Sequence, residues 1–166
     1  MNILICSEFF SPSIGGAQKV CQELALNFSK SGNKVTVVTS KHLTKLKSKE
    51  NFKNKIKIIR YSITGNLVKG IKGETKKYQK FLLDNKFDAI LFYAAQQWTF
   101  DAALEIIDKI DANIYFAPCG FSKLNNLLYR KYFETLPKFL KKFKKNILHS
   151  NDYRDSIFFK KHNIKN

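Results

Sequence analysis

The sequence predicts an α/β fold built on a doubly wound, mostly parallel, Rossmann-like sheet. Short apolar runs that suit buried strands alternate along nearly the whole chain with segments whose apolar residues recur at helical spacing. Such alternation favours right-handed crossovers and a parallel sheet with helices on both faces. The chain has 166 residues, enough for one well-filled core and too few for two ordinary domains. We therefore expect a single domain over residues 1–166.

The first forty residues predict a strand, a helix and a second strand. Asn2 to Cys6 is a short apolar run, and Ala17 to Lys30 carries apolar residues three and four positions apart. Gly32 follows, and glycine accepts the left-handed conformation common at helix ends. Val35 to Thr39 is the next apolar run. Together these elements predict a βαβ unit.

The middle of the chain is less regular. Ser40 to Lys55 is polar and rich in lysine, and we expect a long surface loop there. Ile56 to Ile63 predicts a third strand, Thr64 to Asn66 a turn, and Gly70 to Gly73 a loop. Glu74 to Asn85 has the apolar spacing of a helix.

The second half of the chain continues the alternation. Pro137 suits the first turn of a helix, because its missing N–H would be unpaired there anyway. We expect strands at Ala89 to Tyr93, Ile114 to Ala117 and Asn146 to His149, and helices at Thr99 to Ile110, Leu124 to Thr135, from Pro137 onward, and at Asp152 to Lys161.

The net charge of +17 is concentrated in two segments. Residues 1–40 carry a net charge of +1, residues 41–80 carry +11, residues 81–120 carry −4 and residues 121–166 carry +9. Basic patches attract nucleic acid, anionic lipid or phosphorylated small molecules. The alternative interpretation is a lysine-rich, solvated surface.

One basic stretch, KFLKKFKKN at residues 138–146, has an apolar side. Phe139, Leu140 and Phe143 would share one face of a helix there, with lysines on much of the rest. That pattern is typical of a helix that lies on a membrane surface. The candidate membrane contacts are Lys138, Lys141, Lys142, Lys144 and Lys145.

Cysteine and histidine usage favours neither disulfides nor a metal centre. Cys6, Cys21 and Cys119 occur singly, without a CxxC pair, which fits a reducing cytoplasm. None of the three histidines has further ligands at metal-site spacing, so we expect no metal. No stretch approaches the roughly 20 apolar residues that a membrane span needs.

The loop between the first strand and the first helix is a candidate anion site. Gly15 and Gly16 directly precede the helix, where free backbone N–H groups and the helix dipole favour an anion. The loop is longer than usual, which suggests a lid or a cleft wall. The alternative is that the glycines only let the chain turn. Neither GxGxxG nor GxxxxGK[ST] is present, so the dinucleotide and P-loop fingerprints do not apply.

Two later loops should lie at the same edge of the sheet, because the carboxyl ends of parallel strands meet there. Gln96, Gln97 and Trp98 suit hydrogen bonds and stacking with a sugar or a base, although a core position for Trp98 is the alternative. Cys119 has no histidine partner in sequence, which argues against a nucleophile. No catalytic residue is assigned. The candidate cleft residues are Gln18, Lys19, Gln96, Gln97, Trp98, Cys119, Gly120 and Phe121.

The chain resembles the N-terminal half of retaining GT-B glycosyltransferases, in the group called family 4 or group 1. FFSPSIGGAQKVCQELALNFSKSGNKVTVVTS is similar to that family's opening, with its strand, Gly-Gly loop, helix and G-x-x-V-T-V-x-T strand. FDAILFYAAQQWTFD resembles the family's fourth-strand segment and IYFAPCGFSKL its fifth. ILHSNDYRDSIFF is similar to a later segment in which a Ser precedes acidic and basic residues.

The resemblance implies one half of a GT-B fold, in which two Rossmann-like domains face each other across a cleft. The first domain binds the acceptor and the second the nucleotide-sugar. Gly15 and Gly16 would then lie beside the donor phosphates once the cleft closes. The chain ends at Asn166, about where the family's second domain begins. We therefore expect the C-terminal donor-binding domain to be absent and the chain alone to be inactive.

The sequence departs from the family at two places where members carry a histidine. One is the end of the strand that here finishes in Pro118-Cys119, and the other lies near Tyr93. Neither position holds a histidine here. A histidine-assisted mechanism therefore has no support in this sequence.

From the resemblance we expect the parent protein to be a hexosyltransferase-like glycosyltransferase in cell envelope polysaccharide biosynthesis. It would transfer a sugar, with retention, from a nucleotide-sugar to a cell-surface glycan or lipid-linked acceptor, with no cofactor required. Its partners would be the donor domain, the acceptor and an anionic membrane surface, and its location the cytoplasm, peripherally on the inner face of the plasma membrane.

The alternative hypotheses are a stand-alone non-catalytic partner subunit and a basic nucleic-acid-binding module. No RRM, KH or zinc pattern supports the second of these, so we expect no nucleic acid as a partner.

Overall fold

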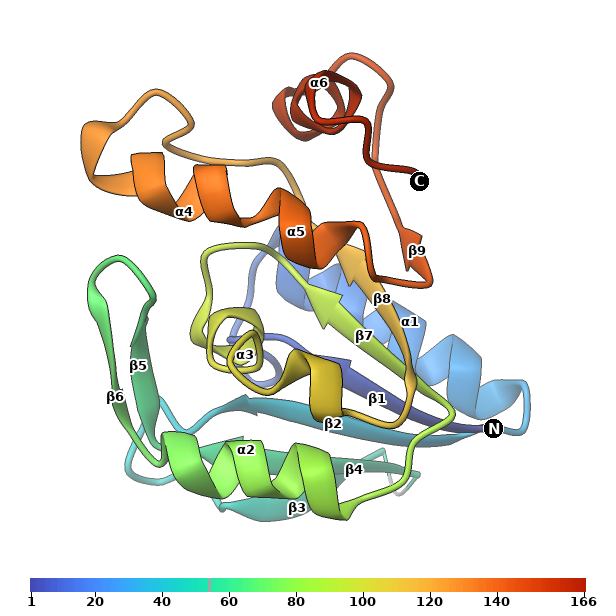
Figure 1. The fold of residues 1–166 in the computed structure, drawn as a ribbon. Helices are drawn as coiled ribbons and strands as arrows, with labels where there is room; N and C mark the ends of the chain where they lie inside the picture. The colour runs from blue at the N-terminus through green and yellow to red at the C-terminus, as the bar shows by residue number, and fades with distance from the viewer. Residues whose placement is uncertain (54) are drawn as a thin grey trace.

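Seven strands form one mostly parallel sheet in the computed structural model, which describes residues 1–53 and 55–166 (Figure 1). The sheet order is β3-β4-β2-β1-β7-β8-β9. All neighbouring strands are parallel except β3, which runs antiparallel to β4. The strands are β1 Asn2–Cys6, β2 Lys34–Ser40, β3 Lys49–Phe52, β4 Ile56–Tyr61, β7 Ala89–Tyr93, β8 Asn113–Ala117 and β9 Lys145–Asn146. The α/β, Rossmann-like fold class predicted from the sequence is confirmed.

The parallel strands follow the doubly wound order. Counted along the chain, the six parallel strands lie in the order 3-2-1-4-5-6, so the winding direction reverses between β1 and β7. In sheets of this kind the crevice for a ligand opens outside the carboxyl ends of the strands at that reversal. The loops after β1 and β7 therefore border the expected ligand crevice.

Helices cover the two faces of the sheet unequally. Cys21 and Ala25 of α1 pack against β1 and β2 on one face, and α1 lies behind the sheet in Figure 1. The remaining helices contribute to a larger core on the other face, where Phe100 and Phe116 stack with ring centroids 4.2 Å apart. The helices are α1 Gly16–Lys30, α2 Thr75–Asp84, α3 Trp98–Asp101, α4 Arg130–Thr135, α5 Pro137–Leu140 and α6 Arg154–Lys161, with 3-10 turns η1 at Ile107–Lys109 and η2 at Leu127–Tyr129.

A small hairpin replaces several elements predicted for the middle of the chain. The predicted strand Ile56 to Ile63 divides into β4 and β5, and the predicted turn Thr64 to Asn66 is part of strand β5, Ile63–Asn66. The predicted loop Gly70 to Gly73 is strand β6, Gly70–Gly73, paired antiparallel with β5. The glycines that suggest loops instead provide positive φ angles within the hairpin.

The predicted loop Ser40 to Lys55 is wrong in part. Ser40 belongs to β2, and β3 forms within the predicted loop as an edge strand. A polar strand rich in charge suits a sheet edge because it discourages pairing with other chains. Residue 54 of the predicted loop lies outside the described residues.

Two predicted helices are shorter than expected. Thr99 to Ile110 divides into α3 and η1. The residues between them are mostly apolar and buried, and their backbone hydrogen bonds join residues three apart, as in a 3-10 helix, instead of four apart. Leu124 to Thr135 starts only at η2, where the Asn126 side chain accepts a hydrogen bond from Leu128 N. The strand predicted at Asn146 to His149 is β9, which ends at Asn146.

The membrane-surface helix predicted over residues 138–145 does not form as a helix of that length. Helix α5 ends at Leu140, and the chain then turns toward β9. Leu140 and Phe143 are buried in the core and Phe139 packs against it, so the apolar side faces the protein. The lysines of this segment are exposed. Among the described residues, no helix combines the length and apolar character needed to cross a bilayer.

Two glycines of the hairpin offer a matched test of its geometry. Gly65 and Gly70 both have positive φ. A Cβ added to Gly65 would lie 1.9 Å from the carbonyl oxygen of Gly70, whereas a Cβ added to Gly70 would meet nothing within 4 Å. We expect Gly70→Ala to lower the free energy of unfolding by about 1–2 kcal/mol. Gly65→Ala should cost more than about 3 kcal/mol, because backbone must shift. Urea denaturation of both variants checks this, and equal costs would contradict it.

Candidate functional site

The loops after β1 and β7 and the end of β2 are tied together at the carboxyl edge of the sheet. The Glu8 backbone N–H donates to Gln97 Oε1 at 3.0 Å. The Glu8 carbonyl oxygen accepts from Ser40 N at 2.9 Å and from Thr39 Oγ1 at 3.0 Å. Gln97, a predicted cleft residue, therefore joins the two strands between which the winding of the sheet reverses.

The long loop before α1 is held from two sides. The buried Arg60 guanidinium donates from Nη2 to the Ser11 carbonyl at 2.6 Å and pairs through Nη1 with Glu50 at 2.7 Å. Ser13 Oγ lies 3.0 Å from His42 Nε2. These contacts anchor the loop to β3, β4 and the segment after β2.

The first turn of α1 is open to an anion. The helix begins without a side-chain cap and without an acidic residue in its first turn. A Cβ at Gly16 would meet nothing within 4 Å, whereas a Cβ at Gly15 would lie 2.5 Å from Gln18 Oε1. The Gln18 side chain therefore lies against Gly15 at the start of α1. Lys19 forms an exposed ion pair with Glu23 at 2.8 Å.

The loops after β7 and β8 carry several residues in the left-handed conformation. Ala94, Gln96 and Cys119 have φ of 73°, 58° and 58°, and Gly120 has 82°. Ser122 Oγ donates to Gln96 Oε1 at 2.8 Å, which joins the two loops. Residues held in this region by their surroundings gather at ligand sites. The structure thus brings Gln96 and Gly120 into one strained pair of loops.

Trp98 and Phe121 belong to the core, so their prediction as cleft residues needs correction. Trp98 is fully buried, and its indole N–H donates to Ser40 Oγ at 2.7 Å. Phe121 packs edge-on against Phe133 and Phe158, with centroids 5.4 and 5.0 Å apart. Neither ring has a free face for stacking on a sugar or a base.

Cys119 is placed as a protonated thiol. Burial raises its pKa, and its Sγ donates to the Ala117 carbonyl at 3.4 Å. Its neighbour Gly120 donates its backbone N–H to Asp155 Oδ2 at 3.0 Å. A Cβ at Gly120 would lie 2.3 Å from Tyr153 Cε1. The loop after β8 is thereby packed against the start of α6.

Asp101 is the buried carboxylate that links these loops to the hairpin. It is 1% exposed, and its Oδ2 accepts from Leu67 N at 3.0 Å in the turn between β5 and β6. Its Oδ1 accepts from the Tyr132 hydroxyl of α4 at 2.9 Å, and that hydroxyl accepts from Gln96 N at 3.3 Å. Burial raises the pKa of Asp101 to about 6.

Glu8 is the second carboxyl group with a raised pKa at this edge. It is half-buried just after β1. Burial, and to a smaller extent repulsion from the Asp101 carboxylate, raises the pKa of Glu8 to about 7. The sequence offered no signal for this shift, because it depends on the approach of α3 to the loop after β1.

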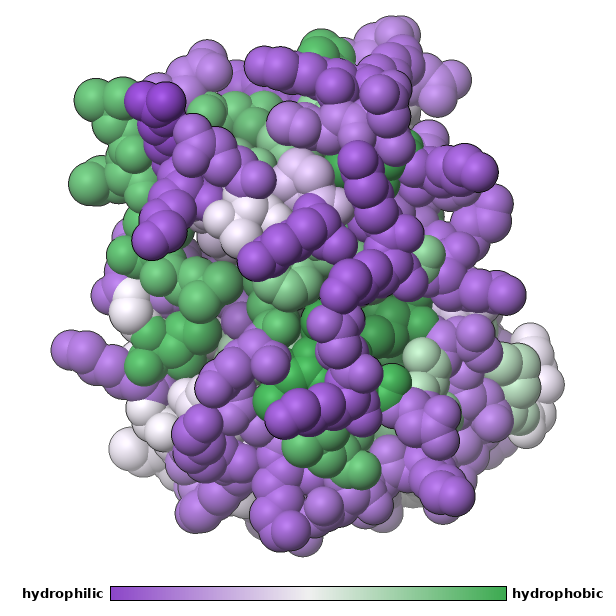
Figure 2. All heavy atoms as spheres, in the orientation of Figure 1, coloured by the Kyte–Doolittle hydropathy of each residue, from purple (hydrophilic) through white to green (hydrophobic). Residues whose placement is uncertain are grey.

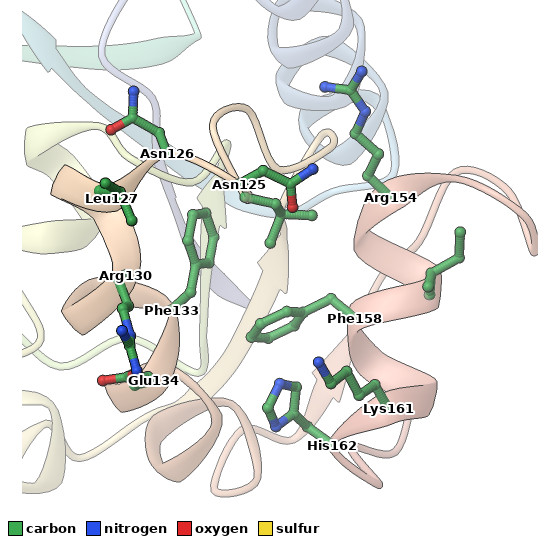
Figure 3. Close-up of a pocket in the computed structure, with 12 residues that line it drawn as sticks. Asn125, Asn126, Leu127, Arg130, Phe133, Glu134, Arg154, Phe158, Lys161 and His162 are labelled. Atoms are coloured by element: carbon green, nitrogen blue, oxygen red, sulfur yellow. The ribbon is translucent and has the colours of Figure 1, made fainter.

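A pocket of about 390 Å³ lies between α4 and α6 (Figure 3). We call it the α4–α6 pocket. The ring of Phe158 on α6 points toward Phe133 on α4, and the two ring centroids lie 5.8 Å apart. Glu134 pairs with Arg130 at 2.8 Å. The polar and charged residues that line it are Asn125, Asn126, Arg130, Glu134, Arg154, Lys161 and His162.

The sequence did not identify this pocket. Its two walls come from residues 124–134 and 154–162, which meet only in the folded protein. His162, near the end of the chain, lines the pocket, and its ring centroid lies 4.4 Å from that of Phe158. Burial and the nearby Lys161 and Lys141 lower the pKa of His162. Amides, cations and aromatic rings together suit an anionic or sugar-bearing ligand.

Two of the lysines predicted to contact a membrane, Lys142 and Lys144, lie apart from these loops. Lys144 N donates to the carbonyl oxygen of Ile114, near the start of β8, whereas the cleft residues follow the ends of the strands. Lys142 pairs with Asp108 at 2.8 Å. The structure does not bring Lys142 or Lys144 into the candidate site. Within the described residues, no group of three or more potential metal ligands is assembled.

Comparisons with known proteins find a likeness of fold. No family model matches the chain, and no curated protein matches its sequence. Among solved structures, sucrose-phosphate synthase from Thermosynechococcus elongatus matches over 96% of this chain, with a TM-score of 0.71 and 10% identity. A second structure of that protein matches over 99% of this chain, with a TM-score of 0.65 and 10% identity. The chain spans 44% of the first structure's chain and 83% of the second's.

The raised pKa of Glu8 predicts how stability changes with pH. Its pKa rises from 4.5 to about 7 on folding, so the folded state binds the proton more tightly, and stability falls as pH rises between those values. We expect Glu8→Gln to remove this loss, so the variant gains stability relative to the wild-type chain from pH 5 to pH 8. Urea unfolding at both pH values measures the difference.

Glu23→Gln is the control for that measurement. Lys19 lowers the pKa of Glu23, which therefore stays ionised across this range, and its replacement should leave the pH profile parallel to that of the wild type. A Glu8→Gln profile that is also parallel would contradict the assigned shift.

Proposed function

We propose that this chain is the acceptor-side, N-terminal domain of a retaining GT-B glycosyltransferase of family 4. The observation that carries the proposal is the likeness of fold over 96% of the chain to sucrose-phosphate synthase, a GT-B glycosyltransferase. The opening Gly-Gly loop and the G-x-x-V-T-V-x-T strand support the choice of family and of the N-terminal half. The reaction would join a sugar from a nucleotide-sugar to an acceptor hydroxyl, with release of the nucleotide.

The start of α1 is assigned to the phosphates of the donor. The first turn presents N–H groups with no competing acidic side chain, and Gly16 leaves open space beside them. A second domain would hold the nucleotide and close over this edge. Charge that develops on the leaving phosphate would then be stabilised by the helix terminus.

The acceptor is assigned to the loops after β7 and β8 and the adjoining α4–α6 pocket. Gln96 and Gln97 supply amide groups at the carboxyl edge, and Arg154 and Lys161 supply positive charge. Aromatic and amide groups suit a sugar, and the cations suit a phosphate. We infer a glycan or lipid-linked acceptor that carries negative charge.

The setting of the enzyme completes the proposal. The partner is a donor-binding domain, without which this chain would be inactive, and no cofactor is needed. The location is the cytoplasmic side of the plasma membrane, where the acceptor would be presented. Exposed Lys138, Lys141, Lys144 and Lys145 support such a location through their charge.

The proposed function predicts opposite effects of one substitution on stability and activity. Gly16→Asp should not strain the fold, and an acidic residue in the first turn stabilises a helix by about 0.3–1 kcal/mol. The same charge should repel the donor phosphates and lower kcat/KM about 100-fold. The assay uses the full-length polypeptide with a panel of labelled nucleotide-sugars and a membrane extract as acceptor.

Asn27→Asp serves as the matched control, because it adds the same charge at the exposed last turn of α1. Its activity should stay within twofold of the wild type. The proposal fails if no nucleotide-sugar supports transfer, and the phosphate assignment fails if Gly16→Asp and Asn27→Asp are equally active.

A further inference from the structure

A second pocket, separate from the α4–α6 pocket, lies between the β5–β6 hairpin and α4. We call it the hairpin pocket, and its volume is about 420 Å³. Most of the residues that line it are apolar, and the others are Lys131, Tyr132 and Thr135. Leu67 and Val68 come from the hairpin turn, Leu104 from the segment after α3, and Leu128, Leu136 and Phe139 from the region of η2, α4 and α5.

The walls of the hairpin pocket are held by buried hydrogen bonds. Asp101 accepts from Leu67 N on the hairpin side and from the Tyr132 hydroxyl on the α4 side. Asn66 Nδ2 donates to the Tyr129 hydroxyl at 3.3 Å. The pocket is therefore a built feature of the fold, since polar bonds fix both of its sides.

Large apolar side chains stand exposed at the rim of the pocket. Leu128 is 78% exposed and Leu67 is 51% exposed. Figure 2 shows hydrophobic atoms gathered along the edge of the molecule where the hairpin turn and the start of α4 lie. Apolar side chains exposed around an apolar hollow favour an apolar ligand, because binding removes both surfaces from water.

Two ammonium groups accompany this apolar surface. Lys131 lines the hairpin pocket and is exposed. Lys138 Nζ lies 4.9 Å from the centre of the Phe139 ring, and Phe139 also lines the pocket. Residues 121–166, which include most of the walls, carry a net charge of +9. An apolar hollow bordered by cations complements an amphiphile with a negative headgroup.

We propose that the hairpin pocket binds the hydrocarbon chain of an anionic lipid, whose phosphate headgroup contacts Lys131 and Lys138. The volume would accommodate about fourteen methylene groups, if each occupies roughly the 30 Å³ of a water molecule. This inference rests on the proposed function and deepens it, because it names the acceptor as lipid-linked. The headgroup would lie beside α4, whose other side lines the α4–α6 pocket.

Neighbouring leucines provide a matched pair of variants. Leu128 lines the hairpin pocket, whereas Leu127, which is 85% exposed, lines the α4–α6 pocket on the other side of the same turn. Binding in the hairpin pocket requires Leu128 and not Leu127. Nonspecific adsorption of a lipid to exposed apolar side chains would depend on both leucines.

Isothermal titration of the chain with dodecyl phosphate, below its micelle concentration, tests the proposal without any sugar donor. We expect saturable binding that weakens about tenfold in Lys131→Glu and about fivefold or more in Leu128→Gln. Leu127→Gln should bind as the wild type does. Dodecyl maltoside, which keeps the chain, and inorganic phosphate, which keeps the headgroup, should each bind at least tenfold more weakly. Circular dichroism confirms that each variant is folded.

Three results would overturn the proposal. They are dodecyl phosphate binding that Leu128→Gln leaves unchanged, an equal loss in Leu127→Gln and Leu128→Gln, and binding of dodecyl maltoside or inorganic phosphate as tight as that of dodecyl phosphate. Because the titration needs no nucleotide-sugar, its failure leaves the transfer assay to decide the proposed function separately.

Discussion

The arrangement of the candidate site depends on the hydrogen bonds that the buried Asp101 carboxylate accepts. One of its oxygens accepts from Leu67 N in the hairpin turn, and the other accepts from the Tyr132 hydroxyl on α4. Through Tyr132 it also reaches Gln96 in the loop after β7. Burying a charge costs free energy unless the charge is hydrogen-bonded, and the donors from Leu67 and Tyr132 reduce that cost. The same bonds hold the hairpin turn, α4 and the loop after β7 around the carboxylate.

The placement of α4 explains why two unlike pockets adjoin. Its Phe133 side faces α6 across a pocket rich in amides and cations, and its Tyr132 side faces the hairpin across an apolar pocket. Both pockets lie beyond the sheet, close to the loops at the carboxyl ends of β7 and β8. A ligand with a charged, sugar-bearing part and a hydrocarbon part would match this division.

Local patterns were enough to predict the first βαβ unit and the Gly15–Gly16 loop, because each element there carries its own apolar periodicity. The hairpin was missed because Gly65 and Gly70 look like breakers, although they permit its positive φ angles. The apolar side of residues 138–145 was recognised, but nothing local distinguishes burial against a membrane from burial against the core. The pockets join α4 to the hairpin and to α6, so tertiary contacts alone define them.

A double-mutant cycle on Asp101→Asn and Tyr132→Phe tests the central role of the buried carboxylate most directly. At pH 8, above the Asp101 pKa of about 6, the group is ionised and its bond to the Tyr132 hydroxyl is charge-assisted. We predict a coupling energy of about 1.5 kcal/mol or more from urea unfolding of the four proteins. Additive effects, with a coupling below about 0.5 kcal/mol, would contradict the account.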